Sequence, residues 1–175
     1  MRKIVLGLAV TLDGLIEGPK GEYDWCFTDQ DYGMNEFLKS IDAIFYGRKS
    51  YEMMLHAEGG LGANPFAGIR SYVFSNTLTK TGGEGFELIS GNIVQEVLKI
   101  KEEKGKDIWL FGGASLTSSL LNARLVDELW LSVHPVLLGA GKPLFSGIQG
   151  RIKTTLLDTK AYETGLVSLK YRVDK

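Results

Sequence analysis

The stretch "LFGGASLT" (Leu110–Thr117) predicts the place where the chain changes from a strand to a helix. Its two leading apolar residues end a strand-like run, Gly112 and Gly113 follow, and a helix-forming segment starts at Ala114. The first turn of a helix carries unpaired N–H groups and the positive end of the helix dipole, and glycine lets an anion come close to the backbone. The stretch therefore fits either a plain tight turn or a binding site for a phosphate.

Around this stretch, apolar runs of strand length alternate with amphipathic segments. Strands are expected over residues 4–12, 41–47, 71–75, 86–89 and 107–113, and helices over residues 31–40, 48–57, 92–104 and 114–123. Such alternation is typical of a parallel sheet with helical crossovers. Runs over residues 128–135, 154–163 and 165–173 then follow one another without helices, which indicates antiparallel strands at one edge. We expect one domain over residues 1–175 with a mostly parallel α/β sheet.

Two more junctions of strand and turn resemble the first. One is Gly47–Ser50, where Arg48 and Lys49 open a helix, and the other is Ser75–Asn76, at the end of a short apolar strand. Open α/β sheets bind ligands at the carboxyl ends of their strands. A guanidinium at a helix start opposes the dipole unless an anion lies there. The three junctions together favour a phosphorylated ligand, whereas separate turns with an exposed arginine are the alternative.

The composition excludes several classes of protein. Twenty basic residues against twenty-one acidic residues give a net charge of -1, which provides no general attraction to nucleic acid or a membrane surface. The single cysteine, Cys26, excludes an internal disulfide and a cysteine-based zinc site, and no metal site is expected. No apolar run reaches the length of a membrane span, so we expect a cytoplasmic protein. The charged run Lys101–Lys106 is expected to be a solvated helix end.

Several motifs resemble those of one superfamily. "GRKSYE" (Gly47–Glu52) is similar to the G-R-x-T-x-E stretch of dihydrofolate reductases, and "FGGASL" (Phe111–Leu116) to their second glycine pair. "LAVTLDGLIEG" (Leu8–Gly18) resembles the first strand and following loop of the same proteins. "HPVLLGAGKPLF" (His134–Phe145) and "GLVSLKYRV" (Gly165–Val173) resemble the reductase domain of the bifunctional riboflavin biosynthesis deaminase–reductase and its stand-alone relatives.

The resemblance implies a dihydrofolate-reductase-like three-layer fold, with helices on both faces of the sheet, that binds NADPH. It places Gly47, Arg48, Lys49 and Ser50 at the pyrophosphate and the 2′-phosphate, and Ser75 and Asn76 along the adenosine ribose phosphate. It also implies that the pyrophosphate lies on a helix N-terminus made by Gly112, Gly113, Ala114, Ser115 and Leu116, and that Ala9 and Ile16 border the nicotinamide.

The sequence also departs from these relatives. The acidic residue that grips the pterin in dihydrofolate reductases has no counterpart in a matching motif, although Asp29, Asp31 and Glu36 are near the first predicted helix. The Pro-Trp pair of their active-site loop is absent, and Asp24-Trp25 takes its place. The zinc signature of the fused deaminase is excluded by the single cysteine, so the resemblance extends to the reductase half.

Hydride transfer needs placement of the two reactants, exclusion of water and a source for any proton. Asp13, at the end of the first strand, and Trp25, in the following loop, are the candidate catalytic residues. A turn residue and a loop anchor are the alternative interpretations. His56 is expected to be structural, His134 to be packed or solvated, and Trp109 and Trp130 to be core residues.

The sequence thus favours an NADPH-dependent oxidoreductase that reduces a small heterocycle, pterin-like or aminopyrimidine-like. The alternatives are the 5-amino-6-(5-phosphoribosylamino)uracil reductase step of riboflavin biosynthesis and a dinucleotide-binding module without catalysis. The apolar run Leu129–Leu138 also suggests an exposed sheet edge or face that pairs with a second subunit, so a homodimer is expected.

Overall fold

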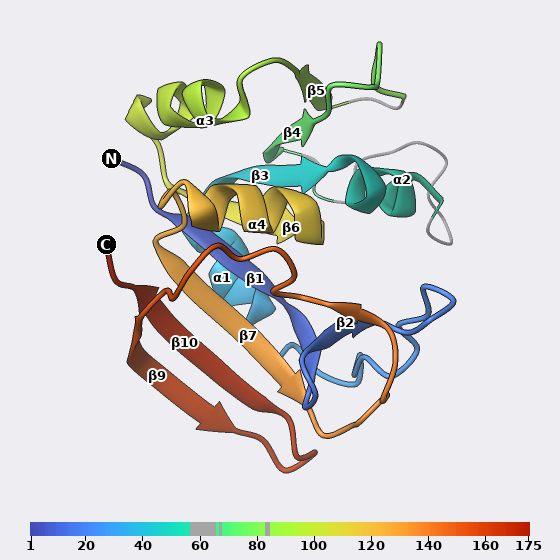
Figure 1. Cartoon of the computed structure of the whole chain (residues 1–175). Helices are drawn as coiled ribbons and strands as arrows, with labels where there is room; N and C mark the ends of the chain where they lie inside the picture. The colour runs from blue at the N-terminus through green and yellow to red at the C-terminus, as the bar shows by residue number, and fades with distance from the viewer. Residues whose placement is uncertain (57–65, 67, 83–84) are drawn as a thin grey trace.

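The computed structural model describes residues 1–56, 66, 68–82 and 85–175, which fold around one large sheet (Figure 1). The strands are β1 (Ile4–Thr11), β2 (Leu15–Glu17), β3 (Ile41–Gly47), β4 (Arg70–Phe74), β5 (Phe86–Ile89), β6 (Asp107–Gly112), β7 (Glu128–His134), β8 (Lys142–Pro143), β9 (Thr154–Ala161) and β10 (Val167–Val173). The helices are α1 (Met34–Ser40), α2 (Arg48–His56), α3 (Ile93–Glu102) and α4 (Ala114–Asn122). The expected end of the second helix at Ala57 lies outside the described residues.

The sheet has eight strands in the order β5-β4-β3-β6-β1-β7-β10-β9. All neighbours from β5 to β7 are parallel, whereas β10 runs antiparallel to both β7 and β9. The predicted mostly parallel sheet with antiparallel C-terminal edge strands is therefore confirmed. Because β3, β4 and β6 are adjacent, the three junctions found in the sequence lie along one edge of the molecule.

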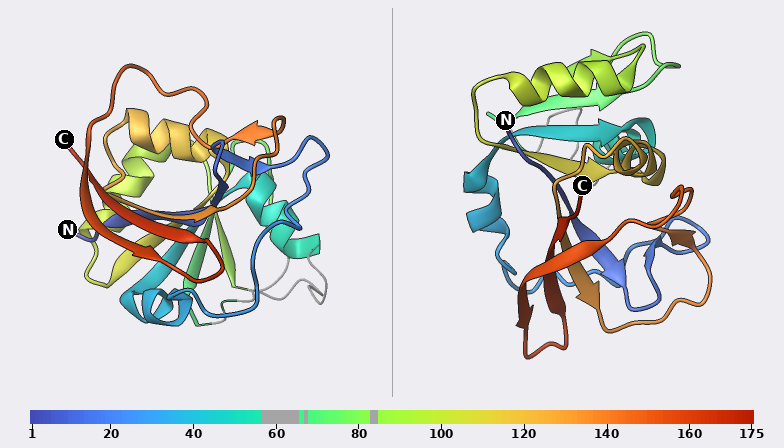
Figure 2. Two further views of the ribbon diagram at one scale, coloured as in Figure 1. Left: turned by 90° about the horizontal axis from the view of Figure 1, so that it is seen from below. Right: turned by 60° about the vertical axis from the view of Figure 1, so that its left-hand side comes forward.

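Helices cover both faces of this sheet, which makes three layers (Figure 2). One core cluster joins apolar side chains of α3 and α4 to one face, including Val97, Leu116 and Leu120. A second cluster joins α1 and α2 to the other face, around Tyr51 and Trp109. Each helix thus buries one apolar stripe against a sheet that is itself apolar on both sides, as parallel sheets are.

A small second sheet was not predicted. β2 and β8 pair antiparallel, although the sequence predicts loops at both places. The approach is close: a Cβ added to Gly141 would lie 2.2 Å from the carbonyl oxygen of Glu17, and Gly141 has a φ of +151°. A glycine and a proline on either side of Lys142 hide so short a strand from a pattern of alternation.

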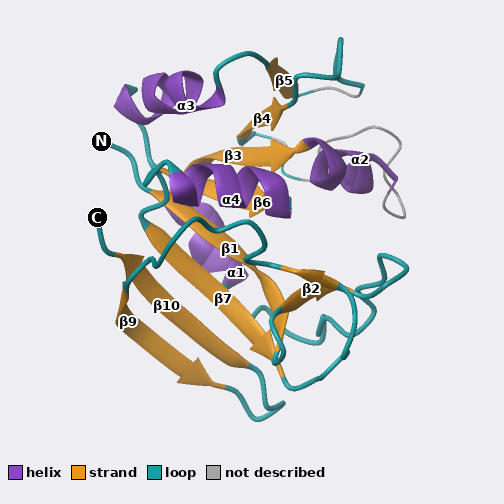
Figure 3. Ribbon diagram, viewed as in Figure 1, coloured by secondary structure: helices purple, strands orange, loops and turns teal. Residues whose placement is uncertain are grey.

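The expected sheet edge is wrong. β7 lies between β1 and β10, and Leu129 and Leu131 are buried, so this apolar run belongs to the interior. The free edge at this side is β9, all of whose residues are exposed. The hairpin of β9 and β10 extends beyond the helices (Figure 3).

The expected solvated helix end over Lys101–Lys106 is confirmed for residues 102–106, which are exposed, but is wrong for Lys101. Lys101 is 2% exposed, and its Nζ donates to the carbonyl of Leu125 at 3.0 Å and pairs with Asp127. Asp127 also accepts the N–H of Ile4 at 2.8 Å and pairs with Lys175 at 2.7 Å. This ion network ties the amino ends of β1 and β7 together, at the end of the sheet away from the three junctions.

Candidate functional site

A cavity of about 790 Å³ lies at the carboxyl ends of β1, β6 and β7. The strands line it with Gly7, Leu8, Ala9, Trp109, Phe111, Gly112, Trp130, Ser132 and His134, and α2 lines it with Lys49, Ser50, Met53 and Met54. The segment that precedes α1 adds Cys26, Phe27, Gln30, Asp31 and Tyr32. A pocket at this edge of an open α/β sheet is the usual place for a ligand.

Hydrogen bonds join the three junctions to one another. The N–H of Gly113, at the start of α4, donates to Ser50 Oγ at 2.9 Å, which links the ends of β6 and β3. The guanidinium of Arg48 donates to Thr77 Oγ1 at 2.8 Å, which links the ends of β3 and β4. The sequence therefore predicted correctly that these residues gather at one edge.

Glycines keep the central junction narrow. A Cβ on Gly47 would lie 3.4 Å from both the carbonyl oxygen of Gly112 and Cβ of Leu116. Gly112 has a φ of +127°, a conformation that favours glycine. In the described structure no side chain caps the first turn of α4, which begins after Gly113. The backbone there has the shape and polarity that suit an anionic group.

The predicted cofactor residues fall into three groups. Those that line the cavity are Ala9, Ile16, Lys49, Ser50, Gly112, Gly113 and Ala114. Gly47 lies directly behind Gly112, Leu116 is buried in the core and Ser115 is exposed at the start of α4. The remaining three, Arg48, Ser75 and Asn76, are outside the cavity lining, at the end of β4 and the start of α2.

Arg48, Ser75 and Asn76 all have partners within the chain. Arg48 Nε pairs with Glu52 Oε1 at 2.7 Å, one helical turn away. Ser75 Oγ accepts the N–H groups of Thr77 and Leu78, and Asn76 Oδ1 accepts the N–H of Gly91 at 2.7 Å. These contacts order the turn after β4 and keep an exposed guanidinium beside it.

Asp13 is placed differently from the predicted catalytic role. It is exposed and lies outside the cavity lining, and its carboxylate accepts Thr11 Oγ1 at 2.6 Å and the N–H of Gly139 at 2.8 Å. These bonds, from Thr11 first, lower the pKa of Asp13. Asp13 is therefore a charged acceptor that ties the end of β1 to the loop around Gly139, and this geometry gives no support to a proton donor.

Trp25 lies next to the cavity wall because it packs on His134, which was not among the predicted site residues. The ring of Trp25 packs edge-on against His134, with 5.3 Å between the ring centroids, and Phe27 packs against the same imidazole at 5.0 Å. His134 Nε2 accepts the N–H of Phe27 at 3.1 Å, and Nδ1 lies 2.9 Å from the carbonyl of Ser132. A neutral imidazole with the proton on Nδ1 satisfies both contacts.

His134 is 3% exposed, and burial lowers its pKa. The neutral ring thus fastens the segment of Trp25–Phe27 to the end of β7. The sequence signal was present but weak, since a histidine before a proline at a strand end fits many roles.

Two tryptophans that were predicted to be core residues also face the cavity. Trp109 donates its indole N–H to the carbonyl of Gly7 at 2.7 Å, and Trp130 donates to Ser168 Oγ at 2.8 Å. A Cβ on Gly7 would lie 3.1 Å from Trp109 Nε1, so the strand needs a glycine there. With their polar atoms satisfied, both rings present apolar surface to whatever fills the cavity.

Four charged side chains line the described part of the cavity. Lys142 Nζ pairs with Glu17 Oε1 at 3.2 Å across the small sheet, and Lys49 comes from the first turn of α2. Asp31 accepts the N–H groups of Gly33 and Asn35 at the start of α1.

Burial raises the pKa of Cys26 to about 11, so that thiol is protonated and unreactive at neutral pH.

The described residues contain no group of three or more His, Cys, Asp or Glu side chains that could hold a metal ion. None of the described helices is long and apolar enough to span a lipid bilayer.

The chain is similar to proteins of known family and fold. It is 41% identical to the uncharacterized protein YyaP of Bacillus subtilis (strain 168), over 97% of this chain and 94% of that protein. A candidate riboflavin biosynthesis protein from Shewanella sp. PV-4 has the same fold with a TM-score of 0.86 and 23% identity, and each chain is covered in full.

Two more solved structures share the fold at lower identity. The Thermotoga maritima deaminase/5-amino-6-(5-phosphoribosylamino)uracil reductase matches at a TM-score of 0.75 and 17% identity, over 99% of this chain and 57% of that chain. Dihydrofolate reductase from Enterococcus faecalis, complexed with NADP(H) and RAB-propyl, matches at a TM-score of 0.72 and 18% identity, over 99% of this chain and 97% of that chain. At such identities these likenesses establish the dihydrofolate-reductase-like fold alone. The family model named RibD C-terminal domain matches residues 2–168, so the chain belongs to the RibD C-terminal domain family.

Proposed function

We propose that this protein is an NADPH-dependent reductase that transfers a hydride to a small heterocycle, pterin-like or aminopyrimidine-like. The observation that carries the proposal is that the ends of β3 and β6 open onto one cavity and are joined by the Gly113–Ser50 hydrogen bond, while the Arg48–Thr77 hydrogen bond holds the end of β4 beside them, outside the cavity lining. Membership of a reductase-domain family and the fold shared with an NADP(H)-binding dihydrofolate reductase support it.

The residues present fit a dinucleotide. The narrow glycine junction of Gly47, Gly112 and Gly113 leaves room for a pyrophosphate at the uncapped start of α4, with Lys49 and Ser50 beside it. Arg48, Ser75 and Asn76 would hold the adenosine 2′-phosphate and ribose at the next strand ends. Ala9 and Ile16 would border the nicotinamide, with Ala114 and the backbone of Ser115 and Leu116 completing the helix start. NADPH, when bound, supplies the hydride.

The other residues of the site would position the reactants and exclude water. We propose that Trp25 closes the site, since its ring is held on His134 beside cavity-lining residues. We propose that Asp13 acts as a positioning residue, because its carboxylate orders the loop around Gly139 next to the end of β1. A reaction inside apolar walls favours hydride transfer over side reactions with water.

Two alternatives are kept. The name of the Thermotoga maritima protein makes a phosphoribosylaminouracil the second candidate substrate. A dinucleotide-binding module without catalysis would bind NADPH but would not oxidise it, whichever acceptor is offered. A cytoplasmic location and a homodimer are also part of the proposal; the homodimer is argued in the Discussion.

Calorimetric titration with NADPH and NADH tests the proposal. We expect NADPH to bind about tenfold or more tightly than NADH, since one charge-assisted contact contributes roughly 1.5–3 kcal/mol. Arg48→Ala should remove that preference. Arg172→Ala is the matched control, because Arg172 is also an exposed arginine paired with a carboxylate, at the far side of the sheet.

The outcomes are distinct. Glu52→Gln frees Arg48 from its partner and should strengthen NADPH binding. If neither nucleotide binds to the wild-type protein, the three junctions are only turns of the fold and the reductase proposal is wrong. If NADPH binds but none of a panel of pterins and aminopyrimidines supports its oxidation, the module is favoured.

A further inference from the structure

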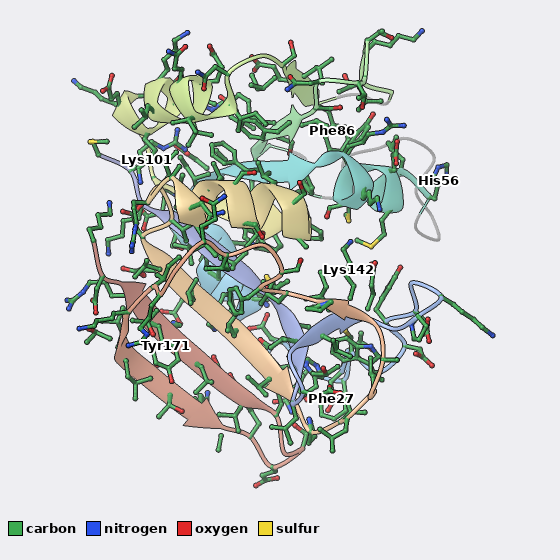
Figure 4. All side chains as sticks on the ribbon, viewed as in Figure 1. Phe27, His56, Phe86, Lys101, Lys142 and Tyr171 are labelled. Carbon is green, nitrogen blue, oxygen red and sulfur yellow. The ribbon has the colours of Figure 1, made fainter. Side chains whose placement is uncertain are left out.

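The cavity is polarised along its length. Its two lysines, Lys49 and Lys142, belong to the end formed by α2, the start of α4 and β8. Figure 4 shows Lys142 between β8 and α2, well apart from Phe27 at the carboxyl end of β7. The two ends of the cavity therefore offer a ligand different chemistry.

The end around Phe27 is aromatic and carries a carboxylate. Phe27 and Tyr32 face each other with ring centroids 6.4 Å apart, and Tyr32 in turn packs against Tyr162 at 4.9 Å. Trp130 adds a third cavity-facing ring. Asp31, between Phe27 and Tyr32 in the sequence, adds the carboxylate. We call this set, Phe27, Asp31, Tyr32 and Trp130, the aromatic end.

The described residues that line the cavity put no lysine or arginine at the aromatic end, and His134, which packs on Phe27, is uncharged while its Nε2 accepts the N–H of Phe27. The undescribed positions 57–65, 67 and 83–84 contain no lysine, arginine or histidine, so they cannot supply one. Two lysines stand near these rings: Lys160 Nζ lies 4.7 Å from the centroid of Tyr162, and Lys170 Nζ lies 5.4 Å from that of Trp130. Neither belongs to the cavity lining, and each is stacked on a ring.

Charge balance then limits what the aromatic end can hold. Lys142 is already paired with Glu17, so Lys49 and the helix start are what the cavity lining keeps for the phosphates of a dinucleotide, and Arg48, outside the lining, is assigned to its 2′-phosphate. A second ligand with its own phosphate brings roughly 1.5–2 further negative charges, and no lysine or arginine of the cavity lining is left to pair with them. Asp31 would add repulsion at short range.

We infer that the aromatic end binds the flat ring of a substrate that carries no phosphate, in contrast to a phosphoribosyl compound. This inference rests on the proposed function, because it assigns the lysine end to the cofactor. The three rings supply stacking surface, and Ser132 and Gln30 supply neutral polar atoms for the edge of a heterocycle.

Matched pairs of probes test the inference on protein saturated with NADP⁺. One pair is 5-amino-6-(5-phosphoribosylamino)uracil and its dephosphorylated form; the other is flavin mononucleotide and riboflavin. We expect the phosphate-free member of at least one pair to bind about tenfold or more tightly in calorimetry. Tighter binding of the phosphorylated members overturns the inference, and so does binding of no member while NADP⁺ stays bound.

Failure of the proposed function is seen separately. If NADP⁺ itself does not bind, the proposed function fails in the first titration. The pairs are then titrated into the free protein, where tighter binding of the phosphorylated members, or binding of no member, overturns the inference.

A gain-of-function variant makes the test sharper. Met34, the first residue of α1, lines the cavity and is 36% exposed. Met34→Lys should strengthen binding of the phosphorylated members by about fivefold, the effect of one unscreened charge at 4 Å in water, and leave the others unchanged. Met34→Gln is the uncharged control. Equal changes for both members of a pair would show that phosphate recognition does not depend on charge here and would overturn the inference.

Discussion

Thr117 places a hydroxyl in the wall of the cavity where no described residue bonds to it. The residue is fully buried in the first part of α4, and its Oγ1 has no hydrogen-bond partner. An unsatisfied buried hydroxyl costs on the order of 1–3 kcal/mol. Because Thr117 belongs to the cavity lining, we expect a bound ligand to be the missing partner of this hydroxyl.

Replacing Thr117 by Val should therefore separate stability from binding. The two side chains have the same shape, and Val removes the unsatisfied oxygen, so we expect the free energy of unfolding to rise by about 1 kcal/mol. NADPH or substrate binding should weaken by about fivefold if the hydroxyl contacts the ligand. Urea unfolding and calorimetry measure the two quantities.

The neighbouring residue provides the contrast. Ser118 Oγ donates to the carbonyl of Ser146, so Ser118→Ala should lower stability without changing ligand binding. If Thr117→Val destabilises the protein as Ser118→Ala does, Thr117 has a partner in solution within the fold, and its hydroxyl is structural.

Sequence reasoning predicted which residues of the backbone turns meet at one edge of the sheet, and their role in cofactor binding stays a prediction. Gly112, Gly113 and Ser50 could be predicted because strand, turn and helix signals are local in sequence. Phe27, Tyr32 and Asp31 were missed as cavity residues, since their segment has no periodicity and reaches the cavity only through contacts with β7 and Tyr162.

At the scale of elements, strands were easier to predict than their neighbours in the sheet. The bounds of β3 agree with the prediction because an apolar run ends there at a glycine. The pairing of β2 with β8 and the interior place of β7 depend on contacts between distant segments, which no local pattern records. Lys101 shows the same limit, because its partner Asp127 belongs to a distant segment, directly before β7.

The contact between β7 and the segment before α1 is pH-sensitive. His134 accepts the N–H of Phe27 only when Nε2 is unprotonated. Burial lowers the pKa of His134, so its folded-state value lies below the unfolded value near 6.5. The stability from the neutral ring is then complete above that unfolded value and is lost as the pH falls below it.

Variants of His134 test this contact. We expect the amide of Phe27 to exchange about fivefold faster in His134→Phe, which keeps a ring but has no acceptor, because one hydrogen bond contributes about 1 kcal/mol. His134→Gln keeps an acceptor and should protect the amide without the pH dependence between 5 and 7. Slow exchange of this amide in His134→Phe would show that ring packing alone holds the segment.

At the scale of the whole molecule, the two ends of the sheet do different work. The carboxyl end holds the cavity, whereas the amino end is closed by the buried pair of Lys101 and Asp127. Burial acts to raise the pKa of Asp127, but hydrogen bonds from Lys101, Lys175 and the N–H of Ile4 outweigh it and lower the pKa. The contribution of this carboxylate to stability is thus complete above its unfolded value of 3.8 and is lost as the pH falls through the lower folded value.

Asp127→Asn should destabilise the protein by about 3 kcal/mol at pH 7, because it leaves the charge of Lys101 buried without a partner. The exposed pair of Lys3 and Glu128, 2.7 Å apart, is the control, and Lys3→Ala should cost less than about 1 kcal/mol. Urea unfolding at pH 7 and pH 3 measures both. Similar losses for the two variants would contradict a special role for the amino-end network.

The outer edge of the sheet is where we place the interface of the proposed homodimer. β9 is exposed along its whole length, and Leu156 and Leu157 are 51% and 47% exposed on a strand whose outer side has no partner strand in the described structure. Such an edge invites pairing with another chain. A second copy of this protein would cover both leucines, so the interface of the proposed homodimer moves from β7, where the sequence placed it, to the hairpin of β9 and β10.

Light scattering at micromolar concentration should give twice the chain mass of 19.3 kDa, and Leu156→Lys with Leu157→Lys should give the mass of one chain. Leu137→Lys is the matched control, because Leu137 is a 68% exposed leucine in a loop and its change should leave the mass at two chains. A wild-type mass of one chain would show that the charged residues of β9, Asp158 and Lys160, are enough to keep this edge unpaired. A dimer that survives both lysines would place the interface on another surface, and the exposed hairpin would then be free to move against the aromatic end, to which Tyr162 connects it.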